Sequence, residues 1–505
     1  MRLLSSAAAL GSLGVLLTLV AASPTFGTTP FRPLGGRVVR PTRVIARPAL
    51  SLDRRQELSG CTSNYGTSGQ FFVGETGGDT NFAGGQYSAV TGGHFNQACG
   101  DTSGIHAGNS NVITATGPYA FIGAGAQNIV TGGAAAVVAG YGNVASGGDA
   151  FVGGGTYGAV PGSDAFLGGG GFAYSEDSPH PQQTPGNIVA GSDSFVGAGD
   201  LNQIAASGNG SFIGAGDYAY SAGGASIAGN QISGSDSFIG TGDQNTVAGN
   251  ASFVGAGTNN TVASTASDAM IGSGARNSAS GQYAVILGGF GNGATGSYAV
   301  VAGGDANTAA GTLSLAGGYH ADAAHNGSFV WSDYTSGSAV LKDTAVNQFV
   351  VRASGGTFLY SNEAGTIGVE LAPGSGTWAS LSDRNAKTDI VPLDDAAVLA
   401  KVAALPVSAW RYASERGARH VGPMAQDFYA AFGVGSDDRH IASIDEDGIA
   451  LSAIKALDAR QGAAAQAIAA LNLKVARKDA RIDRLQARLT TLENRLDSIV
   501  RKPTR

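Results

Sequence analysis

The chain lacks lysine over its first two thirds, and its first lysine is Lys342. Between Cys61 and Val330 the single basic residue is Arg276, against about fifteen Asp and Glu. Such an acidic stretch excludes nucleic-acid binding by this region, because binding to phosphates depends on Lys and Arg. Methionine and tryptophan are also rare, with three of each among 505 residues. This scarcity argues against a conventional large globular core.

Glycine is what the chain has in excess: 80 of 505 residues, about 16% against a usual share of about 7%. The glycines follow no three-residue period and there are only 15 prolines, which excludes collagen. Hydrophobic residues make up 43% and charged residues 13%, which excludes a highly charged disordered chain. The composition favours a repetitive β structure with tight turns.

The N-terminus predicts export. Met1-Arg2 precedes an apolar run that ends in the small residues Val20-Ala21-Ala22, so we predict a secretory signal over 1–22. The alternative is an uncleaved membrane anchor, because the run is about long enough to span a bilayer. No second run of this kind follows, so we expect no transmembrane anchor in the mature chain and a cell-surface or extracellular location.

Residues 23–60 are rich in Arg and Pro and predict an extended linker. The alternative, contact with nucleic acid or anionic lipid, is disfavoured because the segment lacks the aromatic interleaving that base stacking would need. The two cysteines, Cys61 and Cys99, can pair in an exported chain and would then staple the start of the repetitive region. Two unpaired thiols are the alternative. No metal-binding spacing is present and no cofactor is predicted.

Residues 61–335 repeat with a period of about 15 residues, which predicts a solenoid rather than a set of domains. An insertion near 173–189 interrupts the series. The apolar residues assigned to one recurring position are Phe121, Val137, Phe151, Phe166, Phe195, Phe212, Ile227, Phe238, Phe253, Met270, Val285, Val300, Leu315 and Phe329.

One repeat predicts the structure of a coil. Phe253-Val254 forms a short strand that directs a side chain inward, and Gly255 and Gly257 permit a tight turn. Asn259 and Asn260 suit left-handed positions at the next corner, and Thr261-Val262 forms a second strand. Stacked coils would pair strands in parallel and bury a thin line of Phe, Val and Ile. So thin a core predicts lateral association, which we expect to be threefold.

The repeat Ser252-Phe253-Val254-Gly255-Ala256-Gly257, followed by Asn260, resembles the head repeats of trimeric autotransporter adhesins. The resemblance covers about residues 70–330 and implies parallel β-rolls packed as trimers. Those adhesins end in a membrane-spanning β-barrel, which the C-terminal residues here do not resemble. Export through such a pore is therefore not expected.

The repeat ends and the sequence pattern changes near residue 336. We predict a β neck over 336–381, with 347–356 as a strand and turn and 357–360 as its partner, and helices over 396–404 and 424–432. Residues 382–455 resemble the endosialidase-type intramolecular chaperone found at the end of phage tail spikes and fibres. The residues that carry the resemblance are 382–387 (SDRNAK), 405–407 (LPV), Trp410, Tyr412, 422–428 (GPMAQDF) and 447–457 (DGIALSAIKAL).

This resemblance implies that residues 382–465 drive trimer assembly and then cut themselves off at Leu381–Ser382. It assigns Ser382 as nucleophile and Lys387 as general base of a single-turnover serine peptidase, because a hydroxyl needs a base to become a good nucleophile. The alternative is that Ser382-Asp383 is only a turn or helix cap and Lys387 is a surface charge. We expect His420, the other base candidate, to be structural.

The tail, residues 466–505, carries a heptad pattern that predicts a coiled coil. Its core positions are Ile468, Leu471, Val475, Lys478, Ile482, Leu485, Leu489, Leu492, Leu496 and Ile499, with Lys478 the one polar member. Lys474 and Arg488 are placed to meet Asp479 and Glu493 of a neighbouring helix. A single amphipathic helix packed on its own domain is the alternative.

The whole chain therefore predicts a mainly β protein: a trimeric parallel β-roll or solenoid shaft, then a small α+β chaperone domain that ends in a coiled coil. We expect a homotrimeric, adhesin-like surface fibre whose ligand, a host glycan or another surface molecule, the sequence does not name. The alternative is a carbohydrate-binding or carbohydrate-cleaving prophage-type tail spike. Hydrolysis would need clustered carboxylates, and the shaft acids are predicted to be scattered singly at turns (Asp149, Asp164, Asp193 and Asp243).

Overall fold

The computed structural model describes residues 71–72, 81–171, 186–216, 229–334, 337 and 339–501. The predicted signal over 1–22, the predicted linker over 23–60, Cys61 and Ile227 lie outside the described residues.

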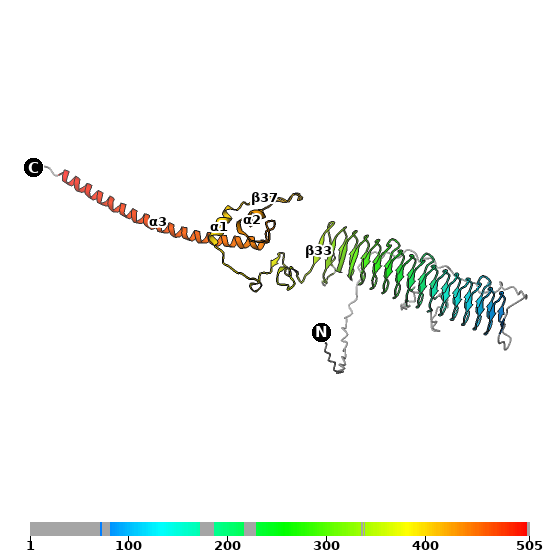
Figure 1. The fold of residues 1–505 in the computed structure, drawn as a ribbon. Coiled ribbons are helices and arrows are strands. Elements are labelled where there is room, and N and C mark those ends of the chain that lie inside the picture. The colour runs from blue at the N-terminus through cyan, green and yellow to red at the C-terminus, as the bar shows by residue number, and fades with distance from the viewer. Residues whose placement is uncertain are drawn as a thin grey trace, which may run out of the picture. The chain divides into compact units, whose positions relative to one another are not determined.

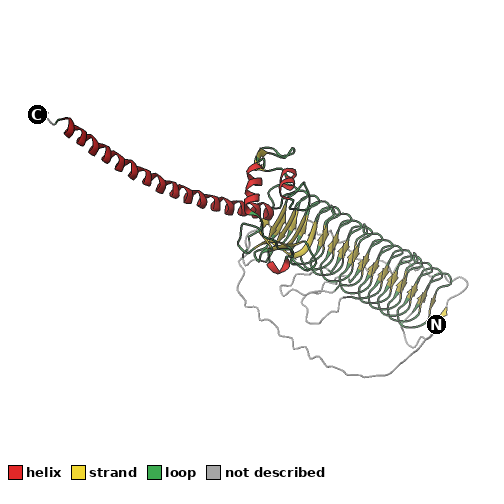
Figure 2. Cartoon of the chain, turned by 60° about the vertical axis from the view of Figure 1, so that its left-hand side comes forward, coloured by secondary structure: helices red, strands yellow, loops and turns green. Residues whose placement is uncertain are grey.

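The repetitive region is a parallel β-solenoid, as predicted, in which each coil contributes one short strand to each of two sheets (Figure 1; Figure 2). Among the described residues the first sheet holds 17 strands: β1 (Phe71–Phe72), β3 (Ala89–Val90), β5 (Gly104–Ile105), β7 (Phe121–Ile122), β9 (Ala136–Val137), β11 (Phe151–Val152), β13 (Phe166–Leu167), β15 (Phe195–Val196), β17 (Phe212–Ile213), β19 (Phe238–Ile239), β21 (Phe253–Val254), β23 (Met270–Ile271), β25 (Val285–Ile286), β27 (Val300–Asp305), β29 (Leu315–Tyr319), β31 (Phe329–Ser332) and β33 (Phe349–Arg352).

The second sheet holds 16 strands in the described part of the chain: β2 (Phe82–Ala83), β4 (Gln97–Ala98), β6 (Val112–Ile113), β8 (Ile129–Val130), β10 (Val144–Ala145), β12 (Ala159–Val160), β14 (Ile188–Val189), β16 (Gln203–Ile204), β18 (Gln231–Ile232), β20 (Thr246–Val247), β22 (Thr261–Val262), β24 (Ser278–Ala279), β26 (Gly293–Ala294), β28 (Thr308–Ala309), β30 (Ala321–Ala323) and β32 (Leu341–Lys342).

The register corrects one residue of the predicted repeat. Phe121 pairs with Ala136, and Ala136 pairs with Phe151, so the residue in this position is Ala136 and not Val137. Val137 points inward and is fully buried. Because side chains alternate along a strand, a shift by one residue moves the assignment to the opposite face.

The line of phenylalanines lies on the outside of the first sheet, which corrects the predicted buried line of Phe. Phe253 is 36% exposed, whereas the next residue, Val254, is 0% exposed. The core consists of Ile, Val, Leu and Ala side chains, mostly from the second residue of each strand, with further alanines from the corners. The outer rings stack coil upon coil with centroids 4.9–5.1 Å apart: Phe151, Phe166, Phe195, Phe212, Phe238 and Phe253.

Buried asparagines form a hydrogen-bonded ladder along the inside of one corner. Asn259 has the predicted left-handed backbone, with φ of 57°, but Asn260 does not and is 0% exposed. Asn260 donates from its backbone N and from Nδ2 to Asn245 Oδ1, at 3.1 and 3.0 Å. The buried asparagines are Asn81, Asn96, Asn111, Asn128, Asn143, Asn187, Asn202, Asn230, Asn245, Asn260, Asn277, Asn292 and Asn307.

Glycine is required at the corners because successive coils approach closely there. A Cβ at Gly257 would lie 1.9 Å from the carbonyl oxygen of Gly274 in the next coil, and φ of Gly257 is +116°. A side chain at this position would both clash and be strained. The excess of glycine therefore follows from the stacking of coils as well as from the turns.

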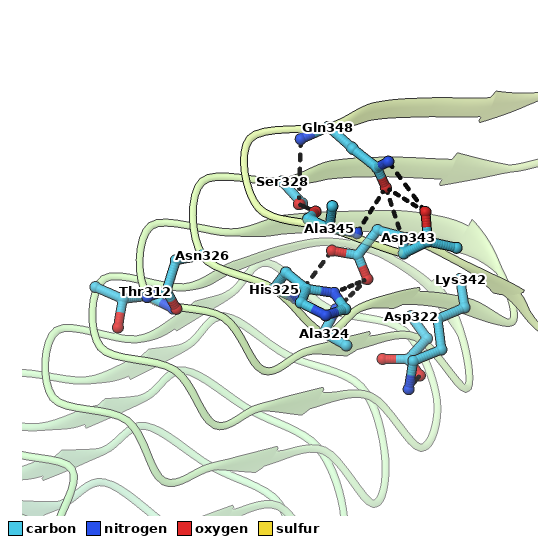
Figure 3. A network of polar contacts seen from close by, with 11 residues as sticks. Thr312, Asp322, Ala324, His325, Asn326, Ser328, Lys342, Asp343, Ala345 and Gln348 are labelled. Carbon is cyan, nitrogen blue, oxygen red and sulfur yellow. Dashed lines mark hydrogen bonds and ion pairs between the residues drawn. The ribbon is translucent and has the colours of Figure 1, made fainter. Parts of the chain in front are cut away.

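The last coil of the second sheet is closed by a buried carboxylate (Figure 3). Asp343 follows β32 in register with Ala323 and is 2% exposed. Its oxygens accept hydrogen bonds from the backbone N of Ala324 and of His325, both at 2.9 Å, and His325 Nδ1 lies 3.1 Å from Oδ1. An acid thus occupies a position that carries Ala, Val or Ile in the preceding coils.

The neck contains a three-stranded antiparallel sheet of β34 (Thr357–Tyr360), β35 (Gly368–Leu371) and β36 (Ala379–Ser380), with β35 in the centre. The predicted pairing of 357–360 with the strand before it is wrong. β33 instead pairs in parallel with β31 and extends the first sheet, and Phe349 stacks on Phe329 with centroids 4.8 Å apart.

The C-terminal part has a small core of its own. It comprises η2 (Arg384–Ala386), α1 (Asp395–Ala404), β37 (Ser408–Trp410), β38 (His420–Gly422), α2 (Ala425–Phe432) and α3 (Ser443–Val500). Val398, Phe428, Ile449 and Ala453 form the buried centre, and the two helices predicted from sequence correspond to α1 and α2. Beyond residue 466 the predicted heptad side chains of α3 are exposed. No described helix is long and apolar enough to cross a membrane.

Candidate functional site

Ser382 and Lys387, the predicted nucleophile and base, are brought into direct contact. Lys387 Nζ donates a hydrogen bond to Ser382 Oγ at 2.5 Å. Both residues are exposed and lie at the two ends of a short turn. The contact is the one that transfer of the hydroxyl proton to the amine would need.

A capped 3-10 turn holds this contact. Asp383 is the N-cap of η2, and its Oδ1 accepts hydrogen bonds from Asn385 N at 2.9 Å and Asn385 Nδ2 at 3.2 Å. Lys387 N donates to Arg384 O at 3.2 Å, which closes the turn. The chain therefore reverses within six residues, and the side chain five positions after Ser382 returns to it. The cap expected at Ser382-Asp383 is present, and Asp383 is its acceptor.

The residue before Ser382 is held by a different element. Leu381 N donates to Gly368 O at 2.9 Å, directly after the pairing of Ala379 with Glu370 and of Ser380 with Val369. The peptide bond between Leu381 and Ser382 thus joins the edge of the neck sheet to the capped turn. The Leu381–Gly368 hydrogen bond could not be predicted, because a strand of two residues is too short to show a period in the sequence.

His420 has a partner of its own. Its Nε2 lies 2.9 Å from Glu415 Oε2, and its ring packs on Trp410 with centroids 4.8 Å apart. Trp410 and His420 are paired residues of the β37–β38 ladder. These contacts agree with the structural role predicted for His420. Glu415 was not recognised from the sequence.

Residues 382–433 match the family model described as chaperone of endosialidase. The match begins at Ser382 and ends at Gly433, the C-cap of α2. This part of the chain is similar to an intramolecular chaperone, a kind of domain that suggests a trimeric fibre or tail-spike-like protein. Comparison with curated proteins found no relative of the chain.

The shaft acids are not scattered singly, which corrects a prediction. Asp149, Asp164 and Asp193 each lie two residues before the outer residue of β11, β13 and β15, three neighbouring strands of the first sheet. All three are exposed and share φ of 54°. The insertion after residue 171 hides this alignment in the sequence, because it separates Asp164 from Asp193 by 29 positions instead of 15. Asp243 lies at the other corner, beside Thr258.

Two further predicted features are incompletely described. Cys99 is disulfide-bonded, whereas Cys61, its predicted partner, lies outside the described residues. Among the described residues no group of three or more His, Cys, Asp or Glu could hold a metal ion.

Proposed function

We propose that the chain is an exported, bacterial, homotrimeric surface fibre whose C-terminal domain drives trimer assembly and then releases itself by cleavage at Leu381–Ser382. Residues 1–22 direct export, and the solenoid is the mature, adhesin-like shaft. The ligand of the shaft is a glycan or another molecule of a host surface. The observation that carries the proposal is the Lys387–Ser382 hydrogen bond of 2.5 Å at the start of the segment that matches the chaperone family.

The outer face of the first sheet supports assembly of the shaft. Its outward residues are apolar in every coil from Phe121 to Phe349, whereas the second sheet carries Gln, Thr, Ser or Gly at the matching positions from Gln203 to Thr308. An unbroken apolar stripe of this length is typical of an interaction surface. Copies of the same chain fit it, because their rings recur at the same coil spacing and the shaft has almost no basic residues with which to bind an acidic partner.

The tail supports assembly at the other end. Nine apolar heptad residues of α3, from Ile468 to Ile499, are 50–68% exposed in the single chain. A helix with an a/d stripe of this kind is stabilised when the stripe packs into the stripe of another helix. Three copies of α3 would cover one another, in agreement with the trimer that the chaperone family implies.

The bonds and protons of the proposed cleavage are accounted for by Ser382, Lys387, Leu381 and one water molecule. Lys387 Nζ, in its neutral form, takes the proton of Ser382 Oγ, and Oγ attacks the carbonyl carbon of Leu381. The Leu381–Ser382 C–N bond breaks, the proton passes to the amide nitrogen of Ser382, and an ester links Leu381 to Oγ. Water then hydrolyses the ester and restores the Ser382 hydroxyl. Each chain reacts once.

The test compares residues 23–505 with the same chain carrying Ser382→Ala. We expect two fragments from the parent chain and one intact chain from the variant, with both eluting as trimers. Mass spectrometry of the new ends should identify Leu381 and Ser382. An uncut trimeric parent chain would exclude the self-cleavage, and a monomeric variant would exclude assembly by this domain.

The second candidate is a carbohydrate-cleaving tail spike, and the alignment of Asp149, Asp164 and Asp193 is the observation that favours it. Neighbouring strands lie about 4.8 Å apart, and retaining glycosidases use carboxyl groups about 5–5.5 Å apart. The three acids are exposed on a corner and not in the cleft that encloses most substrates. A glycan-hydrolysis assay on the released shaft distinguishes the two candidates. Robust turnover would support the tail spike and contradict the adhesin-like function.

A further inference from the structure

The Leu381–Ser382 bond is held on its two sides by hydrogen bonds of two different elements. On one side Leu381 N donates to Gly368 O of β35 at 2.9 Å. On the other side the Asp383 carboxylate caps the turn that returns Lys387 to Ser382. We propose that the neck sheet positions this bond for attack, with Gly368 as a positioning residue. This role rests on the self-cleavage proposed above.

The reaction needs such positioning because the nucleophile is adjacent to the bond that it attacks. Attack by Ser382 Oγ on the Leu381 carbonyl passes through a five-membered ring of Oγ, Cβ, Cα, the amide nitrogen and the carbonyl carbon. A flexible chain reaches this ring rarely. Fixing the Leu381 side in the sheet and the Ser382 side in the turn leaves few bonds free to rotate, and pre-orientation of this kind lowers the entropic part of a barrier.

Gly368 is suited to this role because a side chain would separate the strands. A Cβ at Gly368 would lie 2.1 Å from the carbonyl oxygen of Leu359 in β34. The two strands are paired there, Leu359 with Val369 and Tyr360 with Gly368. Any larger residue must push this end of β35 away from β34. The acceptor for Leu381 N would move with it.

Two matched pairs of variants of the chain 23–505 test the proposal. Leu381→Pro removes the N–H donor, whereas Leu381→Ala keeps it. Gly368→Ala displaces the acceptor, whereas Gly376→Ala makes the same substitution in the same neck at a site where a Cβ meets nothing within 4 Å. We expect Leu381→Pro and Gly368→Ala to slow fragment formation by a factor on the order of 10². Gly376→Ala should cleave at nearly the parental rate, and Leu381→Ala, which keeps the N–H, should cleave faster than Leu381→Pro.

Three readouts separate positioning from general damage. The slow variants should elute as trimers, and the pH dependence of their cleavage rate should keep the parental midpoint, because Ser382 and Lys387 are unchanged. Amide exchange in the Ser382→Ala background should show a protected Leu381 N–H that Gly368→Ala exposes.

The results that contradict the positioning role differ from those that contradict the self-cleavage. Parental rates for both Leu381→Pro and Gly368→Ala, with Ser382→Ala intact, would overturn the positioning role and leave the self-cleavage standing. An unprotected Leu381 N–H in trimeric Ser382→Ala would also overturn the positioning role. An uncut parental trimer would overturn the self-cleavage and, with it, the role of the neck sheet.

Discussion

Gly158 leaves the space that the side chain of Leu167 fills. A Cβ at Gly158 would lie 2.5 Å from Leu167 Cδ2 and 3.1 Å from Asn143 Oδ1. Gly158 stands where the neighbouring coils carry a buried asparagine, and its backbone N donates to Asn143 Oδ1 at 2.8 Å. The larger Leu167, which is 0% exposed, compensates for the missing side chain in this coil.

Substitution of Gly158 should therefore be rescued by a smaller residue at 167. In the uncleaved Ser382→Ala chain we expect Gly158→Ala to lower the free energy of unfolding by about 1–3 kcal/mol, the usual effect of overpacking. Adding Leu167→Val should recover most of this loss. Gly148→Ala, where a Cβ meets nothing within 4 Å, is the control. Additive effects of the two substitutions in denaturant unfolding would contradict the size compensation.

The asparagine ladder should contribute to stability through its carbonyl oxygens. Asn260 Oδ1 accepts hydrogen bonds from Asn277 N at 3.1 Å and from Asn277 Nδ2 at 3.0 Å. Asn260→Ala leaves the buried Asn277 N–H without an acceptor, at a cost of about 1–3 kcal/mol, whereas Asn277 Nδ2 keeps the carbonyl oxygens of Ser273 and Gly289. Thr261→Ala, one residue further and exposed, should change the denaturation midpoint little. Equal midpoints for the two variants would refute the role of the ladder.

Acid should weaken the end of the shaft through Asp343. Burial alone would raise the pKa of this carboxyl, but hydrogen bonds from Ser328, His325 and Ala324 lower the pKa from 3.8 to about 2. The folded state therefore binds its proton less readily than the unfolded state, and the stabilisation is present above about pH 4 and is lost as the pH falls toward 2. Its size is about 2 kcal/mol.

The measurement is the difference in thermal midpoint between the Ser382→Ala chain and its Asp343→Asn derivative. The difference should be largest above pH 4 and should shrink toward pH 2, where the carboxyl is neutral. Subtraction removes the contribution of Asp333, whose pKa is also lowered, chiefly by the hydrogen bond from Ser354. A gap that stays constant with pH would show that Asp343 acts by shape and not by charge.

Lys387 should be replaceable as a hydrogen-bond donor but not as a base. Arginine at position 387 can still donate to Ser382 Oγ, yet it stays charged and cannot accept a proton. We expect Lys387→Arg to abolish fragment formation while trimers still form. Lys401→Arg, on the exposed side of α1, is the control and should cleave normally. Cleavage of Lys387→Arg at the parental rate would exclude Lys387 as the base.

The two outer faces of one coil should behave differently in the assembled shaft. Phe238 of β19 and Thr246 of β20 both point outward, from opposite sheets. If the first sheet faces the threefold axis, Phe238→Cys should give disulfide-linked chains on a non-reducing gel and Thr246→Cys should not. The reverse pattern would place the second sheet at the interface. Cross-linking of neither would exclude a shaft packed along its sheets.

The repeat was predictable because a 15-residue period and paired apolar residues are visible in the sequence. The direction of the phenylalanines was not. In Phe253-Val254 either residue can point inward, and two residues give too short a strand for alternation to decide. The choice follows from space: an interior as thin as that of one coil admits Val, Ile or Ala at each level, and Phe is left outside to stack on its neighbours.

At the candidate site, Ser382 and Lys387 were identified from a resemblance, and their contact required the structure. The spacing of five alone does not bring two side chains together, and it is the cap by Asp383 that bends the segment. Gly368 could not have been predicted from the sequence, since it lies 13 residues before Leu381 on the neighbouring strand. Its contact is made by backbone atoms, which do not depend on the residue type.

Asp343 marks the last level of the second sheet. Its carboxylate accepts the hydrogen bonds of Ala324 N and His325 N in the coil before it, where the preceding level uses the backbone carbonyl of Ala323. This end of the shaft is thus built by local contacts, independently of the number of repeats before it. Coils inserted or removed upstream of Asp343 in whole units would change the reach of the fibre and leave its end, its neck and its cleavage site unaltered.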